Sequence, residues 1–157
     1  MSSGLRAGLE IRETVRVSLP SYRGRPITTW FDVVPWVNID WIENRTLFGV
    51  LAGYPSRLGI EPLIPPRGLP EDVSPTIRQR YDEWNGLAFD ASWVTMDELV
   101  MMVERLTTAL EARAEGAGLE ELRKLHLNIS IDAVIAFLTV YQERGFYPQM
   151  VFWSTPI

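Results

Sequence analysis

Residues 95–110, TMDELVMMVERLTTAL, form the stretch that decides the fold. Thr95 and Glu98 have the spacing of a capping box, in which each side chain accepts a hydrogen bond from the backbone N–H of the other residue. Apolar residues then recur at helical spacing on one face: Leu99, Val103, Leu106 and Leu110. The pattern predicts an amphipathic helix that buries this face in the core of the domain.

Further helices are predicted on both sides of this stretch. Ser74 precedes Pro75 as an N-cap residue precedes the first helical position, so a helix is expected from there to about Trp84. Gly116 and Gly118 are expected to end the long helix. The remaining helical expectations are a short helix over 45–52, a helical turn or two over 119–125, and a helix that Ser130 caps and Gly145 closes.

Strands are predicted near both ends of the chain. Apolar residues alternate with polar ones over 9–19, and a second extended stretch over 27–36 is expected to pair with it as an antiparallel neighbour. Residues 150–153 form a last strand. The sequence therefore predicts an α+β domain over 9–157, with one small antiparallel sheet and helices packed on one face, after a flexible tail over 1–8.

Composition excludes several function classes. The chain has no cysteine and one histidine, His126, so a thiolate zinc site, an iron–sulfur cluster and a multi-histidine metal site are impossible. The glycine patterns that bind nucleotide phosphates are missing. Net charge is −5, which argues against binding to duplex nucleic acid. With neither a secretory nor a membrane-spanning segment in the sequence, we expect a cytoplasmic protein without a membrane partner.

Aromatic and arginine side chains suggest a ligand pocket. Trp30, Phe31, Trp36 and Trp41 lie close together in the sequence, and Trp93 follows a proline-rich loop, residues 54–70, that carries Arg57 and Arg67. Rings that stack and guanidinium groups that bind charge are what a planar anionic ligand requires. The alternative interpretation places the rings in the core of the sheet.

A set of acidic residues and the single histidine have weaker functional interpretations. Asp32, Asp40 and Glu43 in one stretch, with Asp90 and Asp97 in another, could supply oxygen ligands to Mg²⁺ or Ca²⁺, although such acids are more often solvated or capping residues. His126 could act as a general base, or it could be a half-buried structural imidazole.

Residues 67–74, RGLPEDVS, resemble a motif of a family of small uncharacterised tailed-phage and prophage proteins. Members tend to show an Arg-aromatic-Leu-Phe-x-x-Leu-Ala segment before the motif and a Ser-Trp-Leu-Thr-x-x-Glu-Leu segment after it. The matching positions here are Arg45, Leu47, Phe48, Leu51 and Ala52, then Ser92, Trp93, Val94, Thr95, Glu98 and Leu99. One departure is Phe89-Asp90-Ala91, which stands where the family often carries histidines.

The resemblance implies a phage accessory protein that acts by binding. Its candidate ligand-binding residues are Arg45, Arg57, Arg67, Gly68, Asp90, Ser92 and Trp93. Arg67 would contact an anion, and Gly68 would let the backbone approach it. In the alternative interpretation the motif is a structural junction between a loop and a helix, with Arg67 paired to Asp72 or Asp90.

The leading functional expectation is thus a non-enzymatic homo-oligomer, in an infected or lysogenic bacterium, that captures a nucleotide-like anion or a host defence protein. It assigns no catalytic residue, metal or cofactor. Two alternatives stay open: a metal-dependent phosphodiesterase or nuclease that uses Asp32, Asp40, Asp90 and Asp97, and a phage structural or assembly protein that uses tryptophans and the 95–110 helix as interface anchors.

Overall fold

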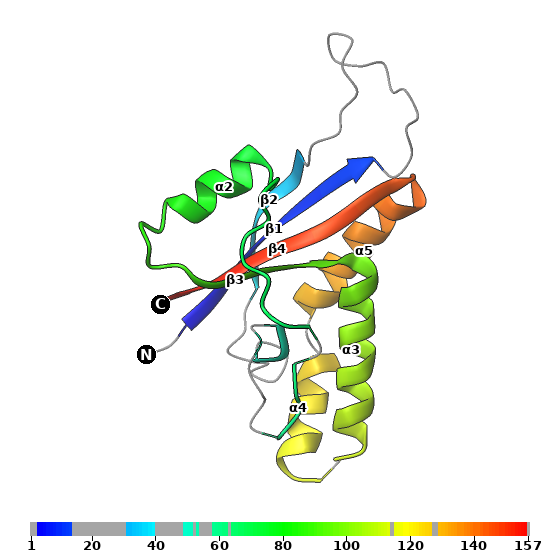
Figure 1. Ribbon diagram of the computed structural model, residues 1–157. Helices are drawn as coiled ribbons and strands as arrows, with labels where there is room; N and C mark the ends of the chain where they lie inside the picture. Colours follow the sequence, from blue (N-terminus) through cyan, green and yellow to red (C-terminus); the bar gives the residue numbers. More distant parts are fainter. Residues whose placement is uncertain are drawn as a thin grey trace.

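The computed structural model describes residues 3–13, 31–39, 49–51, 53, 58–62, 64–113, 115–126 and 129–156. Its strands in these parts are β1 (Ser3–Glu13), β2 (Phe31–Ile39), β3 (Phe89–Thr95) and β4 (Phe146–Pro156). Its helices there are α2 (Pro75–Asp82), α3 (Met96–Glu111), α4 (Ala117–His126) and α5 (Ile129–Glu143) (Figure 1). The predicted α+β class is confirmed.

The strands form a four-stranded sheet in the order β2-β1-β4-β3, and every neighbouring pair is antiparallel. β1 and β4 pair along their whole length, from Ser3 opposite Pro156 to Glu13 opposite Phe146. They occupy the middle of the sheet, and residues 148–155 of β4 are all buried. Such a nearly continuous run of buried residues is typical of a strand that is covered on both faces of the sheet.

Several element boundaries differ from the sequence expectation. The predicted flexible tail over 1–8 is wrong for residues 3–8, because they belong to β1 and pair with β4. The expected antiparallel pairing of the first two strands is confirmed; the second strand, expected over 27–36, is described at Phe31–Ile39, and residues 27–30 lie outside the described residues. The last strand begins at Phe146, not at Met150, and β3 was not predicted. Residues 14–19, 45–48 and 52 lie outside the described residues, and 49–51 are helical as expected.

One face of the sheet packs against α3 and α5, and α4 packs on α3. Leu9 of β1 and Met150 and Phe152 of β4 lie in the same buried cluster as apolar residues of α3 and α5. Four buried residues of α3 follow helical spacing: Leu99, Met102, Leu106 and Leu110. The predicted apolar face is therefore confirmed, except that Met102 is fully buried there and Val103 is only partly buried.

The opposite face of the sheet carries α2, so the expectation that the helices pack on one face only is wrong. Val151 and Trp153 alternate with the residues that face α3, and they pack in a second cluster with Ile77 of α2. Tyr81 of α2 meets the Trp153 ring edge-on, with the ring centroids 5.5 Å apart and the planes at 89°. In Figure 1, α2 and the α3–α5 group accordingly lie on different sides of the strands.

The helix ends confirm some of the predicted signals and correct others. Thr95 and Glu98 form the predicted capping box at the start of α3. Ser74 is the N-cap residue of α2, but its hydroxyl makes no capping hydrogen bond. Gly116 has the positive φ of a turn, +56°, whereas Gly118 lies inside α4 instead of ending the preceding helix.

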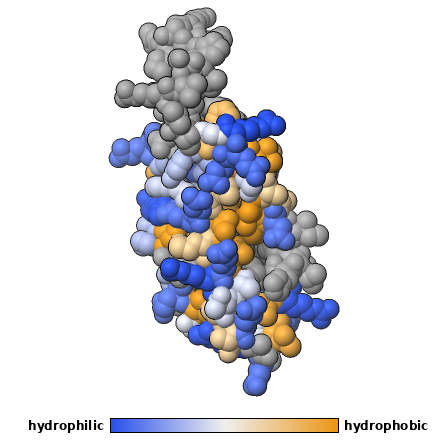
Figure 2. All heavy atoms as spheres, turned by 90° about the vertical axis from the view of Figure 1, so that its right-hand side faces the viewer, coloured by the Kyte–Doolittle hydropathy of each residue, from blue (hydrophilic) through white to orange (hydrophobic). Residues whose placement is uncertain are grey.

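The side of the molecule that carries α3 and α5 is shown in Figure 2. Apolar residues gather in the middle of this face, and hydrophilic residues surround them. On α5, Val140 is 45% exposed, while Phe137 and Tyr141 form a ring pair with centroids 5.3 Å apart. Scattered exposure of apolar side chains is ordinary for a folded domain.

Gly8 allows α2 to pack closely on β1, which yields a test of this interface. A Cβ atom at Gly8 would lie 2.6 Å from Cδ1 of Ile77, a residue with no exposed surface. We expect Gly8→Ala to lower the free energy of unfolding by about 1–3 kcal/mol through overpacking. Urea denaturation measures this change.

The combination with Ile77→Ala supplies the control, because it removes the atoms that a Cβ would meet. The double variant should lose less stability than the sum of the two single variants. Additive losses would contradict close packing of α2 on this glycine.

Candidate ligand-binding site

The candidate site is built around the junction of β3 and α3. Thr95 ends β3 and caps α3, and its hydroxyl accepts a hydrogen bond from the Glu98 backbone N–H at 3.2 Å. The Glu98 carboxylate accepts from the Thr95 backbone N–H at 2.9 Å. The capping box therefore fixes the Glu98 side chain at the start of the helix, where the helix dipole also favours a negative charge.

Arg67 binds this same carboxylate. Its Nη1 and Nη2 atoms lie 2.9 and 2.6 Å from the two carboxylate oxygens of Glu98, which is a bidentate geometry. Nη1 also donates to the Trp93 carbonyl oxygen at 3.3 Å, and the guanidinium carbon lies 4.3 Å from the centroid of the Trp93 ring. An ion pair, a hydrogen bond and a cation–π contact thus hold one guanidinium.

The backbone of the loop is fixed at the same place. The Arg67 N–H donates to the hydroxyl of Ser92 at 3.1 Å, and Ser92 is buried on β3. Gly68 follows with φ +75°, a conformation that favours glycine. The loop is therefore attached to β3 through its backbone as well as through the guanidinium group.

The ion pair shifts the pKa of both partners. Hydrogen bonding from Arg67 is the main cause that holds the pKa of Glu98 below its ordinary value, against the opposing effect of burial. The hydrogen bond to Glu98 is the main cause that raises the pKa of Arg67. Their side chains are 24% and 28% exposed, so solvent screens the pair only in part.

A half-open hollow of about 330 Å³ lies beside this ion pair. We call it the Arg67 hollow; its lining residues are Arg67, Pro70, Asp72, Trp93, Thr95, Glu98, Tyr147 and Gln149. The volume is at the lower end of the range for small-molecule sites, roughly 300–1,000 Å³. Two rings line it, and its one guanidinium is outnumbered by two carboxylates, so the lining is negative by one formal charge.

Gln149 connects the lining of the Arg67 hollow to a buried carboxylate. The Gln149 side-chain amide donates a hydrogen bond to Glu10 of β1, which has no exposed surface. The Ser74 backbone N–H donates to the other carboxylate oxygen of Glu10 at 2.9 Å. Burial is the main cause that raises the pKa of Glu10, and these hydrogen bonds oppose the rise. The carboxylate joins the start of α2 to the middle of the sheet.

The structure brings together three of the seven residues predicted to bind ligand, namely Arg67, Ser92 and Trp93. Gly68 adjoins them; it is exposed, and a Cβ atom added to it would meet no other residue within 4 Å. Asp90 lies on β3 with φ +52° and does not line the Arg67 hollow. Arg45 and Arg57 lie outside the described residues.

The alternative interpretation, an acid that pairs with Arg67, is correct in kind but names the wrong acids. The partner is Glu98, not Asp72 or Asp90. The sequence patterns assigned Glu98 a capping role and a position in the family motif, but no contact with Arg67. They did not identify Tyr147 or Gln149, which reach the Arg67 hollow from β4. Their polar character at alternate positions of a terminal strand was the available signal.

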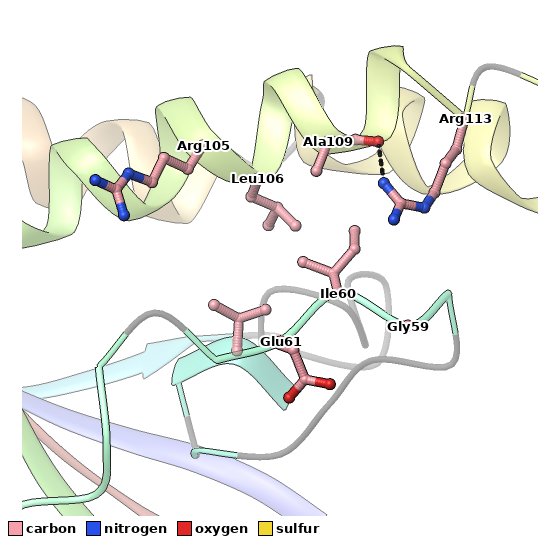
Figure 3. A pocket seen from close by; sticks show the side chains of 8 residues that line it. Gly59, Ile60, Glu61, Arg105, Leu106, Ala109 and Arg113 are labelled. Atoms are coloured by element: carbon pink, nitrogen blue, oxygen red, sulfur yellow. Dashed lines mark hydrogen bonds between the residues drawn. The ribbon is translucent and has the colours of Figure 1, made fainter.

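A second hollow of about 230 Å³ lies between α3 and residues 59–61 (Figure 3). Figure 3 shows Leu106 of α3 and Ile60 pointing toward each other across it. Arg113 lies at one end and donates to the carbonyl of Ala109 at 2.9 Å. It is smaller than the Arg67 hollow and its lining contains no aromatic ring, so it is the weaker candidate for a ligand site.

The described residues contain no group of three or more acidic or histidine side chains that could hold a metal ion. Of the acids named in the enzyme alternative, Asp97 accepts a hydrogen bond from Gln142 at 3.1 Å, and Asp90 lies on β3. Asp40 and the side chain of Asp32 lie outside the described part, as does the side chain of His126. The metal-dependent alternative therefore stays a prediction.

Comparisons with models of protein families, with curated proteins and with solved structures found no match to this chain. The resemblance to phage proteins in the RGLPEDVS segment thus stays a prediction. Within the described residues, the helices are too short or too polar to cross a lipid bilayer.

The Arg67–Glu98 pair predicts a pH dependence of stability. Because the folded pKa of Glu98 lies below 4.5, its stabilising contribution is complete above that pH and is lost as the pH falls through the folded pKa. Relative to Glu98→Gln, the wild type should lose on the order of 1 kcal/mol of unfolding free energy between about pH 6 and pH 3. Urea melts at several pH values measure the difference.

Glu104→Gln is the matched control, because Glu104 is an exposed acid on the same helix. It should keep the pH profile of the wild type. A Glu98→Gln profile parallel to that of the wild type would contradict the ion pair.

The raised pKa of Glu10 predicts a pH dependence of stability with the opposite sign. Because its folded pKa is raised above 4.5, its contribution is present below that pH and is lost as the pH rises through the folded value. Glu10→Gln removes this loss, so its stability relative to the wild type should increase by on the order of 1 kcal/mol as the pH rises from about 4.5 to 8. Thermal melts across this range measure the trend, and a constant difference between the two proteins would contradict it.

Proposed function

We propose that the protein is a non-enzymatic binding protein and that the Arg67 hollow takes a planar, nucleotide-like small molecule. The observation that carries the proposal is the arrangement of Arg67, which Glu98 and Trp93 hold at the wall of the hollow. A guanidinium that is fixed before binding loses little conformational freedom when it contacts a ligand. Trp93 and Tyr147 supply rings on the same lining.

The rings and the polar groups of the Arg67 hollow match the two parts of such a ligand. Aromatic side chains stack on nucleobases, and each such contact contributes roughly 1–3 kcal/mol. Thr95 and Gln149 add polar groups near Arg67, as is typical of small-molecule sites, where a few polar atoms orient a ligand among apolar walls.

The charge of the lining selects among nucleotide-like ligands. Asp72 and Glu98 outnumber Arg67, so a ligand with several phosphates would meet repulsion. This favours a nucleoside, or a nucleotide with few charges whose phosphate reaches solvent through the open side. The sequence predicted that Arg67 captures an anion. Because Glu98 already neutralises this guanidinium, the proposed ligands are limited to those with few negative charges.

Capture of a host defence protein, homo-oligomerisation, an origin in a phage and a role in the virion remain predictions. None of the contacts around the Arg67 hollow favours them over a small ligand. The small-ligand function is therefore the one that the described contacts support best.

The proposal predicts a thermal stabilisation by nucleosides. We expect at least one of the common nucleosides or their monophosphates to raise the melting temperature, because a ligand at 100 times its Kd adds about 2.7 kcal/mol to stability. Tyr147→Ala should abolish the shift, since Tyr147 lines the Arg67 hollow and is 39% exposed.

Phe89→Ala is the matched control. Phe89 is also an aromatic residue, 43% exposed and on the adjacent strand β3, but it does not line the hollow. This variant should bind ligand like the wild type. An unchanged melting temperature with every nucleoside and monophosphate would contradict the proposed function.

A further inference from the structure

The free hydrogen-bond donors of Arg67 restrict the base that the Arg67 hollow can take. A guanidinium carries five N–H donors. Glu98 uses one hydrogen on each of Nη1 and Nη2, and the Trp93 carbonyl takes the second hydrogen of Nη1. The Nε–H and the second Nη2 hydrogen make no hydrogen bond with the residues that the structure describes. These two donors lie side by side on one edge of the group.

Two parallel donors in one plane require two adjacent acceptors in one plane. Of the two purine bases, guanine presents such a pair, N7 and O6, and its bidentate contact with arginine is the commonest specific contact of proteins with base edges. Adenine has an acceptor and a donor at the equivalent positions, so one of its groups would oppose a donor of Arg67. The open edge of Arg67 therefore favours guanine over adenine.

The position of Trp93 agrees with this pairing. The guanidinium carbon of Arg67 lies over the Trp93 ring at 4.3 Å from its centroid. A base that binds the free edge of this guanidinium therefore lies near the Trp93 ring, and contacts between aromatic groups are favourable.

The carboxylates provide a partner for the other edge of guanine. Guanine also has two N–H donors, at N1 and N2, on the edge next to O6. Asp72 lines the Arg67 hollow, and an ionised carboxylate accepts about four hydrogen bonds, so it can accept from a base in addition to its contacts within the protein. Glu98 is already engaged by Arg67 and by the Thr95 N–H, which makes Asp72 the residue that reads these donors.

We propose that the Arg67 hollow recognises guanine, with Arg67 on N7 and O6 and Asp72 on the N1 and N2 donors. This inference rests on the proposed binding of nucleotide-like ligands and specifies their base. A nucleoside or a monophosphate of guanine is the ligand class that it predicts.

The test compares guanosine with analogues that each lose one recognised group, in isothermal titration calorimetry on the full chain. Adenosine and 7-deazaguanosine, which lacks N7, should each bind at least ten-fold more weakly than guanosine. Inosine lacks the N2 amine and should bind several-fold more weakly. Guanosine triphosphate should bind more weakly than the monophosphate, because of the charge of the lining.

Asp72→Asn isolates the second contact, because Asp72 is exposed and its substitution leaves the Arg67–Glu98 pair in place. This variant should bind guanosine and inosine with nearly equal affinity. Asp82→Asn, an exposed acid on α2 outside the Arg67 hollow, should keep the wild-type preference.

The two proposals fail in different ways. If guanosine, adenosine and 7-deazaguanosine bind with equal affinity, recognition of guanine is overturned and the proposed function stands. If none of the nucleosides or monophosphates binds, the proposed function is overturned, and this inference with it. A guanosine preference that Asp72→Asn leaves unchanged overturns the role of Asp72.

Discussion

The bidentate pair between Arg67 and Glu98 is the interaction on which the candidate site depends. One carboxylate accepts from the Thr95 N–H, and so caps α3, while both of its oxygens also bind the guanidinium. The same guanidinium contacts the carbonyl and the ring of Trp93 on β3. Loop, strand and helix thus meet at one charged contact, and the loop cannot move away without leaving a partly buried carboxylate unpaired.

The sheet determines what surrounds this contact. β4 lies between β1 and β3, so Tyr147 and Gln149 of β4 are brought next to Trp93 and Thr95 of β3 on the face that carries α2. The antiparallel pairing of β1 with β4 then places Glu10 opposite Gln149, where the two side chains bond. The lining of the Arg67 hollow therefore follows from strand order and register.

The parts of the fold that were predictable from sequence are those with local signals. The capping box at Thr95 and the helical spacing of Leu99, Leu106 and Leu110 predicted α3, because these patterns act within a few residues of one another. β3 was missed although Phe89, Ala91 and Trp93 alternate with Asp90 and Ser92, because this stretch was interpreted as part of a binding motif and not as a strand. The apolar residue Val94 then breaks the alternation directly before the capping box, where the helical pattern begins.

Only part of the candidate site was predictable from the sequence. Arg67, Ser92 and Trp93 were singled out, but the partner of Arg67 lies 31 residues away and was one of many acids in the sequence. Tyr147 and Gln149 reach the site through a register between strands that no local pattern specifies. Sequence alone therefore suggested an arginine with rings nearby and an acid as its alternative partner, but it could not identify Glu98 as that acid.

Nitrogen-15 NMR of the arginine side chains tests the central claim most directly. A guanidinium held by Glu98 and by the Trp93 carbonyl rotates slowly about its C–N bonds, so Arg67 should give resolved Nη1 and Nη2 signals in the wild type, and averaged signals in Glu98→Gln. Averaged Nη signals for Arg67 in the wild type would contradict the account, because they would show a guanidinium that no partner holds.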